Sequence, residues 1–374
     1  MARLGDVVKI EASSKQVDGD RFWLLNLDMV EQQTGIIIDY NYVGKDALNG
    51  SIIQFDTGCV LYSKLRPNLN KVVIPSQDGF ATSEMLPLRP NTELLTREYL
   101  TVFLRSDSFV TWAVSKTAGA KMPRLGSKEL LSKEIPLPSI SEQTCIAGRF
   151  AKVDELIALR KEQLAKLDQL VKSRFIELFG ATSAEKCTKR IKDYAEVLGG
   201  YAFKSDLFCT DAIPVIRISN INDGCVKLDN DICFDESFWK QNKRFRAEQN
   251  DILMAMSGAT TGKAGIYKED VPALINQRVA CIRAIDGIAC PMFLFVATQL
   301  EWMYDLIQET SAGCAQPNIS GKQIENMPVP NATYEQQQQF SAFVEQTDKS
   351  KKVILLSLYK LETLKKSLMQ EYFG

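Results

Sequence analysis

The sequence predicts an α+β fold with a pseudo-two-fold repeat, in which two mixed α/β domains are separated by two long helices forming an antiparallel coiled coil. Three observations lead to this prediction. A helical stretch that ends at Phe179-Gly180 is repeated by one that ends at Phe373-Gly374. A Pro-x-Pro segment stands before each helical stretch. Short β-prone runs and turn residues fill the rest of each half.

The repeat can be followed residue by residue. Near the helix ends, seven residues recur 194 positions later, since Leu164, Leu167, Leu170, Lys172, Ser173, Phe179 and Gly180 are answered by Leu358, Leu361, Leu364, Lys366, Ser367, Phe373 and Gly374. Outside the helices, Gly119, Pro123, Leu125 and Lys128 are answered at the same offset by Gly313, Pro317, Ile319 and Lys322. Leucine-rich helices can resemble each other by chance, whereas the other matches indicate a true duplication.

The Pro-x-Pro segments mark where the helices begin. Proline lacks an N–H group and disfavours helix in the residue before it, so each helix is expected to start just beyond Pro138 and Pro330. Ser141 and Thr333 are the expected N-caps. The predicted segments are therefore a first domain at 1–140, a helix at 141–180, a second domain at 181–332 and a helix at 333–374.

Apolar residues step by three and four along both helices, with arginines at the skipped positions 160 and 174 of the first and a polar interruption near 347–351 in the second. This is the spacing of a narrow seam for another helix. The seam comprises Ile146, Phe150, Val153, Ile157, Leu164, Leu167, Val171 and Leu178 in the first helix and Phe340, Phe343, Ile354, Leu358, Leu361, Leu364, Leu368 and Tyr372 in the second. Each helix would be about 55–60 Å long and would expose this seam if it stood alone. We expect the two helices to pair with each other, with burial against a partner subunit as the alternative.

The two globular halves have the pattern of mixed α+β domains. Strands are predicted at 51–55, 59–62, 71–74, 214–218, 251–254 and 279–282, separated by Gly, Pro and Asn turns. One helix per half is predicted, at 98–114 and at 291–309.

Composition restricts the function classes. An apolar fraction of 45% with 24% charged residues is that of a globular rather than a disordered chain. The sequence has no histidine, which removes the commonest general base, and its nine cysteines form no Cys-x-x-Cys pair, so no metal site is signalled.

The sequence has neither an apolar run of about 18 residues nor a signal peptide, so we expect a cytoplasmic protein without a membrane partner. With a net charge of −1, any DNA contact must be a local pattern.

A loop in the second half carries candidate DNA contacts. The run Met256-Ser-Gly-Ala-Thr-Thr-Gly-Lys-Ala264 is not a nucleotide P-loop, because its glycines enclose three residues instead of four and Ala264 follows the lysine. Backbone N–H groups, hydroxyls and a lysine suit polynucleotide phosphates and base edges. The candidates are Ser257, Thr260, Thr261 and Lys263. A tight turn with a solvent-facing Lys263 is the alternative.

The corresponding loop of the first half, Ser63 to Lys71, is its densest cluster of basic and amide side chains, with Lys64, Arg66, Asn68, Asn70 and Lys71. Arginine pairs with guanine and asparagine with adenine in the major groove, although a solvated charged loop is the alternative. Two copies of one scaffold with different polar residues in the same loop are what two different half-sites require. Further candidates, each of which could equally be a capped turn or rim residue, are Lys121, Arg124, Lys204, Gln277, Arg278, Gln316 and Asn318.

In combination, these motifs resemble the specificity subunit of type I restriction-modification systems over essentially the whole chain. The resemblance rests on Gly199-Gly-Tyr-Ala-Phe-Lys204, Pro214-Val-Ile-Arg-Ile218, Met256-Ser-Gly-Ala-Thr-Thr-Gly-Lys263, Asn276-Gln-Arg278, the Pro-x-Pro segments followed by Glu-Gln, and the paired terminal helices. The first half departs from the pattern, since Ser63 to Lys71 replaces the Ser-Gly-Ala-Thr form. The resemblance implies two target recognition domains at opposite ends of a helical spacer, each reading one part of a bipartite DNA target about one duplex turn, or ~34 Å, apart.

The resemblance also implies the partners. Two methyltransferase (modification) subunits would methylate adenine with S-adenosylmethionine, and restriction subunits would use ATP with magnesium to translocate and cleave double-stranded DNA. This chain would then be non-catalytic and hold no cofactor. In agreement, it has no Asn/Asp-Pro-Pro-Tyr/Phe motif, no Phe-x-Gly-x-Gly motif and no Walker loop.

Two other readings remain open at the level of sequence. The first is a two-headed adaptor on a coiled-coil rod, whose loops bind proteins and not DNA. The second is a DNA-binding protein that acts without a methyltransferase.

Overall fold

The computed structural model describes residues 1–15, 19–48, 50–119, 121–222, 224–229, 231–311 and 317–374. The chain divides into two compact units, one formed by residues 1–161 and 356–374 and the other by residues 162–355. Both boundaries fall inside the long helices α5 (Ile140–Phe179) and α10 (Tyr334–Phe373). Each unit therefore combines one globular domain with a part of both helices.

Over its described residues, the domain of unit 1 is built from two four-stranded sheets and a two-stranded one. Its elements are β1 (Ala2–Arg3), α1 (Leu4–Val7), β2 (Val8–Ile10), β3 (Arg21–Leu25), β4 (Tyr42–Gly44), β5 (Ile52–Phe55), β6 (Val60–Ser63), β7 (Val72–Val73), β8 (Gly79–Thr82), β9 (Met85–Pro90), α2 (Arg97–Leu104), α3 (Asp107–Ser115), α4 (Ser127–Ser132) and β10 (Glu134–Ile135). The sheet orders are β2-β9-β6-β7, β4-β3-β8-β5 and β1-β10, and β3 and β8 are parallel.

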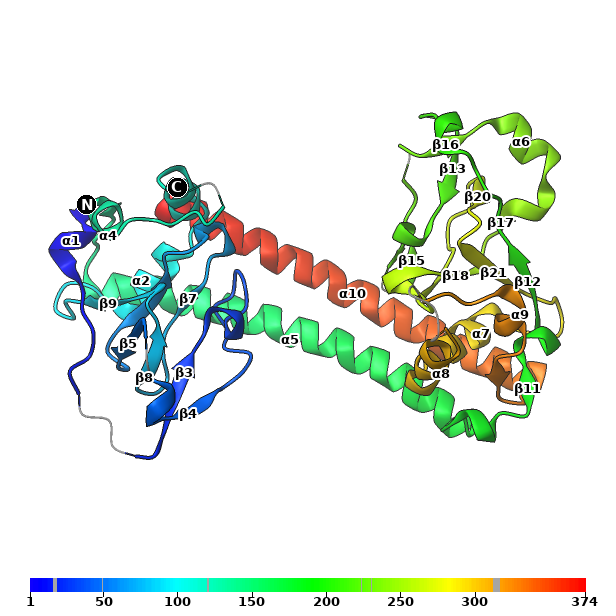
Figure 1. Cartoon of the computed structure of the whole chain (residues 1–374), viewed down its shortest axis with the longest axis horizontal. Helices are drawn as coiled ribbons and strands as arrows, with labels where there is room; N and C mark the ends of the chain where they lie inside the picture. Colours follow the sequence, from blue (N-terminus) through cyan, green and yellow to red (C-terminus); the bar gives the residue numbers. More distant parts are fainter. Residues whose placement is uncertain (16–18, 49, 120, 223, 230, 312–316) are drawn as a thin grey trace. The chain divides into compact units, whose positions relative to one another are not determined.

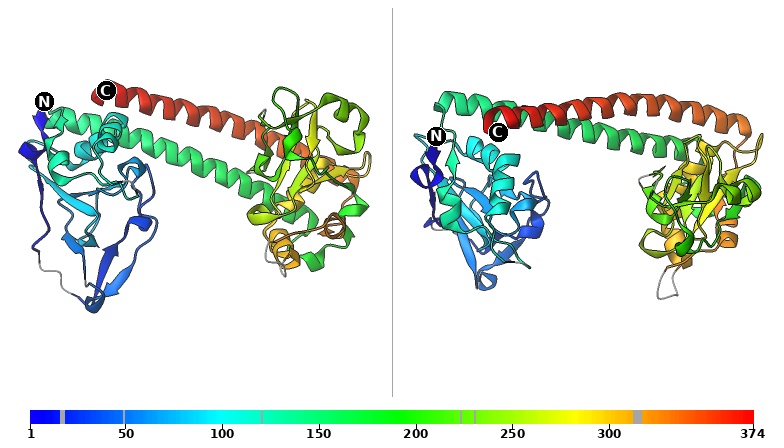
Figure 2. Two further views of the ribbon diagram at one scale, coloured as in Figure 1. Left: turned by 45° about the horizontal axis from the view of Figure 1, so that its top comes forward. Right: turned by 90° about the horizontal axis from the view of Figure 1, so that it is seen from above.

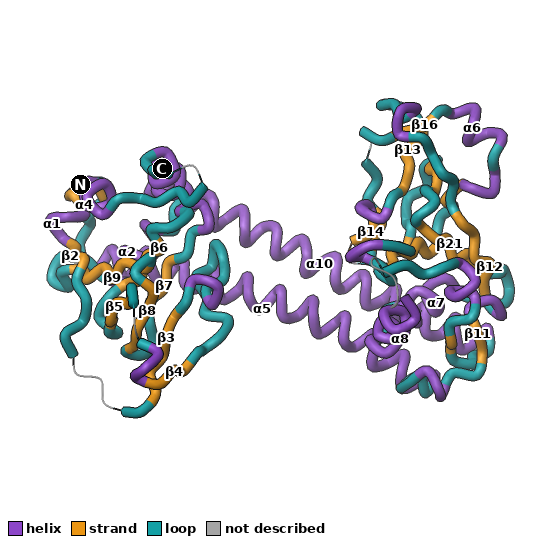
Figure 3. Tube along the Cα trace, viewed as in Figure 1, coloured by secondary structure: helices purple, strands orange, loops and turns teal. Residues whose placement is uncertain are grey.

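The domain of unit 2 repeats this plan. Its elements are β11 (Lys189–Arg190), β12 (Ala195–Gly199), β13 (Ile213–Ile216), β14 (Ile221–Asn222), β15 (Cys225–Val226), β16 (Cys233–Phe234), α6 (Glu236–Gln241), β17 (Arg246–Ala247), β18 (Ile252–Ala255), β19 (Ala264–Ile266), β20 (Ala273–Ile275), β21 (Val279–Ala284), α7 (Pro291–Thr298), α8 (Glu301–Ser311), α9 (Gly321–Glu325) and β22 (Pro328–Val329). The orders β12-β21-β18-β19, β16-β13-β20-β17 and β11-β22 reproduce those of unit 1, including one parallel pair, β13 and β20. Strands β15 and β14 extend the first sheet, and α6 lies beside β16 (Figure 3).

Within each unit the long helices run antiparallel alongside each other, as Figure 1 and the left view of Figure 2 show. In unit 1, Lys365 Nζ lies 2.6 Å from a carboxylate oxygen of Asp154, and Arg160 Nε donates to Ser357 Oγ at 3.2 Å. In unit 2, Lys351 Nζ lies 2.6 Å from Asp168. Contacts between residues early in one helix and late in the other confirm the predicted antiparallel pairing.

The ends of the helices also pack on the globular domains, which corrects two seam positions. Leu178 and Leu364 are 38% and 46% exposed, although the heptad spacing places both in the seam. Phe179 instead packs edge-to-face on Phe293 of α7, with ring centroids 5.0 Å apart, and the Phe373 ring packs at a tilt on Tyr99 of α2 at 5.4 Å. The apolar face therefore turns toward the domain core over the last turns of each helix.

Two further local predictions are wrong. The N-cap of α5 is Ser139 and not Ser141, because Ser139 Oγ accepts from the N–H of Glu142 at 3.3 Å while Glu142 bonds back to the Ser139 N–H at 2.9 Å. The helices expected at 98–114 and 291–309 are each two helices, α2 with α3 and α7 with α8. In the first pair, the Ser106 side chain accepts from the Phe109 N–H and starts a new helix.

The predicted strands are all observed, as β5, β6, β7, β13, β18 and β21, and the N-cap expected at Thr333 is present, since its hydroxyl accepts from the Gln336 N–H. Over the described residues, no helix is long and apolar enough to cross a membrane.

A buried glutamine joins the start of α5 to its domain. Gln143 is fully buried, and its side-chain oxygen accepts from the Thr96 N–H at 2.9 Å. Its amide nitrogen donates to the carbonyls of Leu94 at 2.8 Å and Pro138 at 2.9 Å. All three partners are backbone groups of the loop before α2 and of the Pro-x-Pro segment, so the side chain fixes the direction in which the helix leaves the domain.

The same arrangement recurs at an offset of 194 residues. Gln337, also fully buried, accepts from the Cys290 N–H at 2.9 Å and donates to the carbonyls of Ile288 at 3.3 Å and Ala332 at 3.1 Å. Every partner is the residue 194 positions after its counterpart in unit 1. We call Gln143 and Gln337 the junction glutamines.

A buried ion pair is repeated as well. Asp56, 3% exposed, accepts from Arg89 Nη2 at 2.8 Å, from Ser13 Oγ and from the Gly58 N–H. In unit 2, Asp251 is 2% exposed and forms a two-point contact with Arg283, with Nε and Nη2 at 2.9 and 2.7 Å. Burial by itself would raise the pKa of Asp56, but the hydrogen bonds from these partners outweigh it and lower the pKa to about 2.

Replacing a junction glutamine should destabilise its own unit. Gln143→Ala leaves one N–H and two carbonyls, all partly buried, without these partners and removes a fully buried side chain, so we expect unit 1 to lose about 2–4 kcal/mol of unfolding free energy. Hydrogen exchange at the Thr96 amide and denaturant unfolding measure the effect. The control is Gln169→Ala, at an exposed position of the same helix. Equal loss of protection in both variants would contradict the role given to Gln143.

The Asp56 pair predicts an acid-dependent loss of stability. The pKa of Asp56 is lower in the folded chain, about 2, than its ordinary value of 3.8, so its stabilising contribution is complete above about pH 4 and is lost as the pH falls toward 2. Asp56→Asn should remove this part of the acid dependence, together with about 2 kcal/mol at neutral pH. Denaturant unfolding of unit 1 from pH 7 to pH 2 measures it, and identical pH profiles for both chains would refute the prediction.

Candidate nucleic-acid interface

Three segments of domain 1 meet beside the end of β6. The loop 63–71 closes on itself through the Ser63 N–H and the Lys71 carbonyl, 3.1 Å apart. Lys64 donates its N–H to the Glu84 carbonyl at 3.0 Å, which joins the loop to the turn between β8 and β9. The Leu125 N–H donates to the Lys64 carbonyl at 2.9 Å, which joins it to the segment before α4.

Domain 2 builds the same backbone frame beside the end of β18. The loop 255–263 closes through the Ala255 N–H and the Lys263 carbonyl at 2.9 Å. The Met256 N–H donates to the Arg278 carbonyl at 2.9 Å, and the Ile319 N–H donates to the Met256 carbonyl at 2.9 Å. Position for position, loop 63–71 matches loop 255–263, the turn at 83–84 matches 277–278, and segment 123–125 matches 317–319. The structure thus brings together, in each domain, candidate residues that lie far apart in the sequence.

The candidates in the first loop differ in exposure. Arg66 and Asn68 are exposed and Lys64 is half-buried. Asn70 is buried and its amide donates to the Arg105 carbonyl at 3.1 Å. Lys71 donates to the Leu27 carbonyl, and burial lowers its pKa. In this structure the last two side chains therefore hold the loop, while the first three remain available to a ligand.

Arg124 stands on the neighbouring segment and is held by a carboxylate. Its Nε lies 3.1 Å from both carboxylate oxygens of Glu84, and its Nη2 lies 2.9 Å from one of them. These hydrogen bonds lower the pKa of Glu84 and raise that of Arg124. The side chains of both residues stay partly accessible, at 42% for Arg124 and 25% for Glu84. Lys121 is exposed nearby in sequence.

In the second loop, Thr261 is buried and its hydroxyl donates to the Gly258 carbonyl at 2.7 Å. The hydroxyls of Ser257 and Thr260 are shielded from solvent and have no hydrogen-bond partner among the described residues. Lys263 is exposed and lines a cavity of about 630 Å³ together with Lys172 of α5. The loop depends on Gly262, whose φ is +85° and where a Cβ would lie 2.8 Å from the Ile307 side chain.

The segment Gly199-Gly-Tyr-Ala-Phe-Lys204 holds the turn that carries Gln277 and Arg278. A Cβ on Gly200 would lie 2.2 Å from the Asn276 carbonyl oxygen, so only glycine permits this approach. The Gln277 N–H donates to the Tyr201 carbonyl at 2.8 Å, and both Gln277 and Arg278 are exposed. Asn318 and Lys204 are also exposed. Gln316, the remaining candidate, lies outside the described residues.

Sequence reasoning missed Glu84, the partner of Arg124. The repeat contained a signal for it, because Glu84 stands 194 residues before Arg278, which was a candidate. Its residue type gave no signal, because a carboxylate is repelled by DNA phosphates and is not expected at a phosphate contact.

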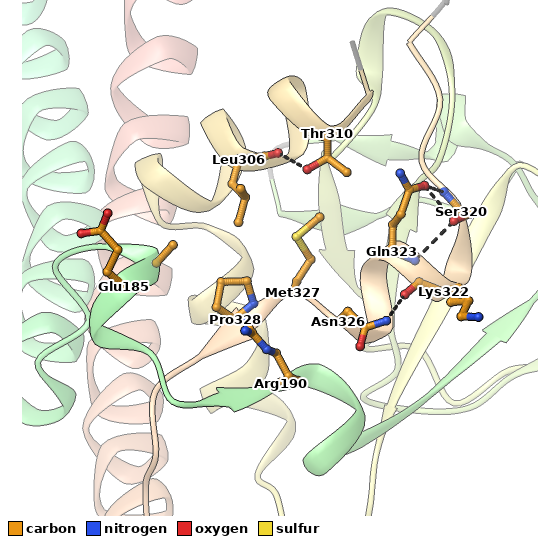
Figure 4. A pocket seen from close by; sticks show the side chains of 11 residues that line it. Glu185, Arg190, Leu306, Thr310, Ser320, Lys322, Gln323, Asn326, Met327 and Pro328 are labelled. Carbon is orange, nitrogen blue, oxygen red and sulfur yellow. Dashed lines mark hydrogen bonds between the residues drawn. The ribbon is translucent and has the colours of Figure 1, made fainter. Parts of the chain in front are cut away.

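Another pocket lies apart from these residues. Figure 4 shows a cavity of about 690 Å³ in unit 2, lined by residues of α8, α9, β11 and β22, including Arg190, Thr310 and Gln323. Its polar groups are engaged locally, since Thr310 donates to the Leu306 carbonyl and Gln323 caps α9 with Ser320. None of the candidates within the described residues lines it.

The frame can therefore present two different sets of hydrogen-bonding groups on one geometry. Domain 1 presents Lys64, Arg66, Asn68 and Arg124, and domain 2 presents Lys263, Gln277, Arg278 and Asn318. Guanidinium and amide groups match the acceptors and donors on purine edges, and lysines match phosphates.

Comparison with known proteins identifies the family of the chain. The family model described as the type I restriction modification DNA specificity domain matches residues 2–169 and 185–360. The MjaVIII type I restriction enzyme specificity subunit of Methanocaldococcus jannaschii is 23% identical over 78% of this chain and 72% of its own length. The EcoBI specificity subunit of Escherichia coli is 26% identical over 69% of this chain, which spans 61% of that protein.

Solved structures share the fold. A chain of a type I restriction-modification system matches all of this chain and 96% of its own length, with a TM-score of 0.62 at 17% identity. The specificity subunit from M. genitalium matches all of this chain and 95% of its own length, with a TM-score of 0.58 at 14% identity. The fold and the two domain matches lead to one conclusion: the chain belongs to the type I restriction modification DNA specificity family.

Proposed function

We propose that this chain is the non-catalytic DNA-recognition subunit of a type I restriction-modification complex. Each globular domain reads one half of a bipartite target, and the long helices set the spacer between the halves and dock the methyltransferase subunits. The candidate residues named above are the proposed DNA contacts.

The observation that carries this proposal is the repeated backbone frame with unlike side chains. A scaffold duplicated only for stability has no need to replace Glu84 and Arg124 with Arg278 and Asn318 at positions that make the same backbone hydrogen bonds. Two half-sites of different sequence require such replacements, because base edges are distinguished by their pattern of donors and acceptors.

Backbone conformation at Arg66 supports a contact role for that residue. Arg66 has a φ of +50°, in the left-handed region, and the matching position of domain 2 is Gly258 with a φ of +83°. A left-handed conformation costs a residue other than glycine about 1–2 kcal/mol. Arg66 is exposed and so gains little from packing, which suggests that its side chain is kept for a ligand.

Partner subunits supply the chemistry in this proposal. Methyltransferase subunits bind S-adenosylmethionine, and restriction subunits use ATP and magnesium. The near-neutral net charge of −1 is consistent with phosphate contacts that are shared with those subunits. Membership of a DNA specificity family does not favour the alternative of a protein-interaction adaptor.

Exchange of one domain tests the division of labour. The chain is co-expressed with its methyltransferase subunit, residues 1–140 are replaced by those of a relative, and methylated adenines are mapped across a genome. We expect one half of the bipartite motif to change and the other to stay. Gln143 contacts only backbone groups, so a foreign domain can be accepted at this junction.

The unaltered complex and the reciprocal exchange of residues 181–332 are the controls. A change in both halves after a single exchange would contradict the proposal. Failure of the unaltered complex to methylate any bipartite motif would favour the adaptor.

Arg66→Gly separates function from stability. We expect the unfolding free energy of unit 1 to stay the same or rise by up to about 1 kcal/mol, because relief of backbone strain offsets the added freedom of the unfolded chain. Methylation directed by the domain 1 half-site should weaken, while the other half of the motif serves as the internal control. Clear destabilisation with unchanged recognition would show that Arg66 is structural.

A further inference from the structure

The matching frames show three positions at which the two domains carry different side chains. Leu65, Glu84 and Arg124 in domain 1 correspond to Ser257, Arg278 and Asn318 in domain 2. In both domains the first and third residues face each other as an isolated β-bridge, and the second closes the turn whose carbonyl accepts from the loop. These three places carry different chemistry in the two domains on the same backbone.

The geometry of the Glu84–Arg124 contact leaves one edge of the guanidinium free. Glu84 binds Nε and Nη2, the side-on edge. Among the described residues, no hydrogen bond of Arg124 uses Nη1. The end-on edge, formed by Nη1 and the second N–H of Nη2, is the pair of parallel donors that matches O6 and N7 of guanine.

The contact of Glu84 with Nε and Nη2 also restricts the orientation of the guanidinium plane of Arg124. An arginine side chain on the surface samples many rotamers, and a two-point contact with a carboxylate removes much of that freedom before a ligand arrives. The backbone of Glu84 lies in the turn between β8 and β9. There its carbonyl accepts from the Lys64 N–H at 3.0 Å. The frame thus holds the backbone from which the carboxylate extends, and the carboxylate orients the arginine.

We propose that Arg124 reads a guanine in the half-site of domain 1 through its end-on edge, and that Glu84 is the positioning residue that orients it. The inference rests on the proposed function. In domain 2, Arg278 occupies the place of Glu84 and Asn318 that of Arg124, so the same frame reads a different base there.

The test measures base discrimination by the complex with its methyltransferase subunits. Binding is compared between a duplex that carries the mapped motif and duplexes with one base pair of the domain 1 half-site replaced. The variants are Glu84→Gln, Arg124→Ala, Arg124→Lys and the double variant Glu84→Gln/Arg124→Ala. Glu93→Gln is the matched control, since it makes the same charge change at an exposed glutamate of the same domain outside the site.

We expect Glu84→Gln to reduce discrimination at a single G·C pair by on the order of 10-fold. Arg124→Ala and Arg124→Lys should relax the same position, and Glu84→Gln should add nothing in the Arg124→Ala background because it acts through that arginine. Affinity for non-specific DNA should not fall, since Glu84→Gln removes a negative charge. The other half of the motif should stay unchanged.

Three results would overturn the inference. Glu84→Gln could leave discrimination unchanged, its effect could persist without Arg124, or it could weaken every position of the half-site alike. Should Glu84→Gln fail to fold, unchanged specificity of Arg124→Lys overturns the assignment on its own. Absence of any bipartite motif for the unaltered complex refutes the proposed function, whereas a bipartite motif that is insensitive to these variants refutes only the role of Glu84 and Arg124.

Discussion

A buried side-chain amide at the base of each long helix constrains much of this structure. Gln143 and Gln337 each connect a helix start, a Pro-x-Pro segment and the loop before a domain helix through three hydrogen bonds to backbone groups. Leaving a buried side-chain amide without hydrogen-bond partners costs more free energy than its hydrogen bonds contribute when they are made. All three segments must therefore meet in one geometry. Because only backbone groups are involved, the surrounding sequence can vary while the junction stays the same.

Aromatic packing extends this constraint to the other end of each helix. Phe179, at the end of the first helix, packs on Phe293 of the second domain, and Phe373 packs on Tyr99 of the first. Each unit is thus built from one domain, the start of the helix that follows it and the end of the other helix. Both domains can bind the end of a long helix in this way, because Tyr99 and Phe293 are aromatic residues at corresponding positions of the repeat.

The loops 63–71 and 255–263 differ in sequence, although the frame that carries them is the same in both domains. The left-handed positions of the loop are glycines in domain 2, Gly258 and Gly262, and are Arg66 and Asn70 in domain 1. Asn70 compensates by bonding to the Arg105 carbonyl, whereas Arg66 is exposed. Stability and recognition therefore separate by position: backbone hydrogen bonds and buried residues keep the frame, and exposed residues on that frame carry chemistry that differs between the copies.

The sequence by itself determined the duplication, the two long helices, six of the strands and the family, because heptad spacing, proline junctions, β-prone runs and offset identities are local or periodic signals. It also located the two loops. It placed an N-cap at Ser141 instead of Ser139 and merged α2 with α3, since several nearby hydroxyls could cap a helix and only the local hydrogen bonds of Ser139 and Ser106 show which ones do. It put Leu178 and Leu364 in the helical seam, since the turn of a face toward a domain core depends on contacts with distant residues. Only the tertiary structure decided which candidates are available to a ligand. It buried Asn70 and Thr261, left Arg66 and Arg278 exposed, and paired Arg124 with Glu84, because burial and ion pairing depend on segments that are distant in the sequence and meet in one frame.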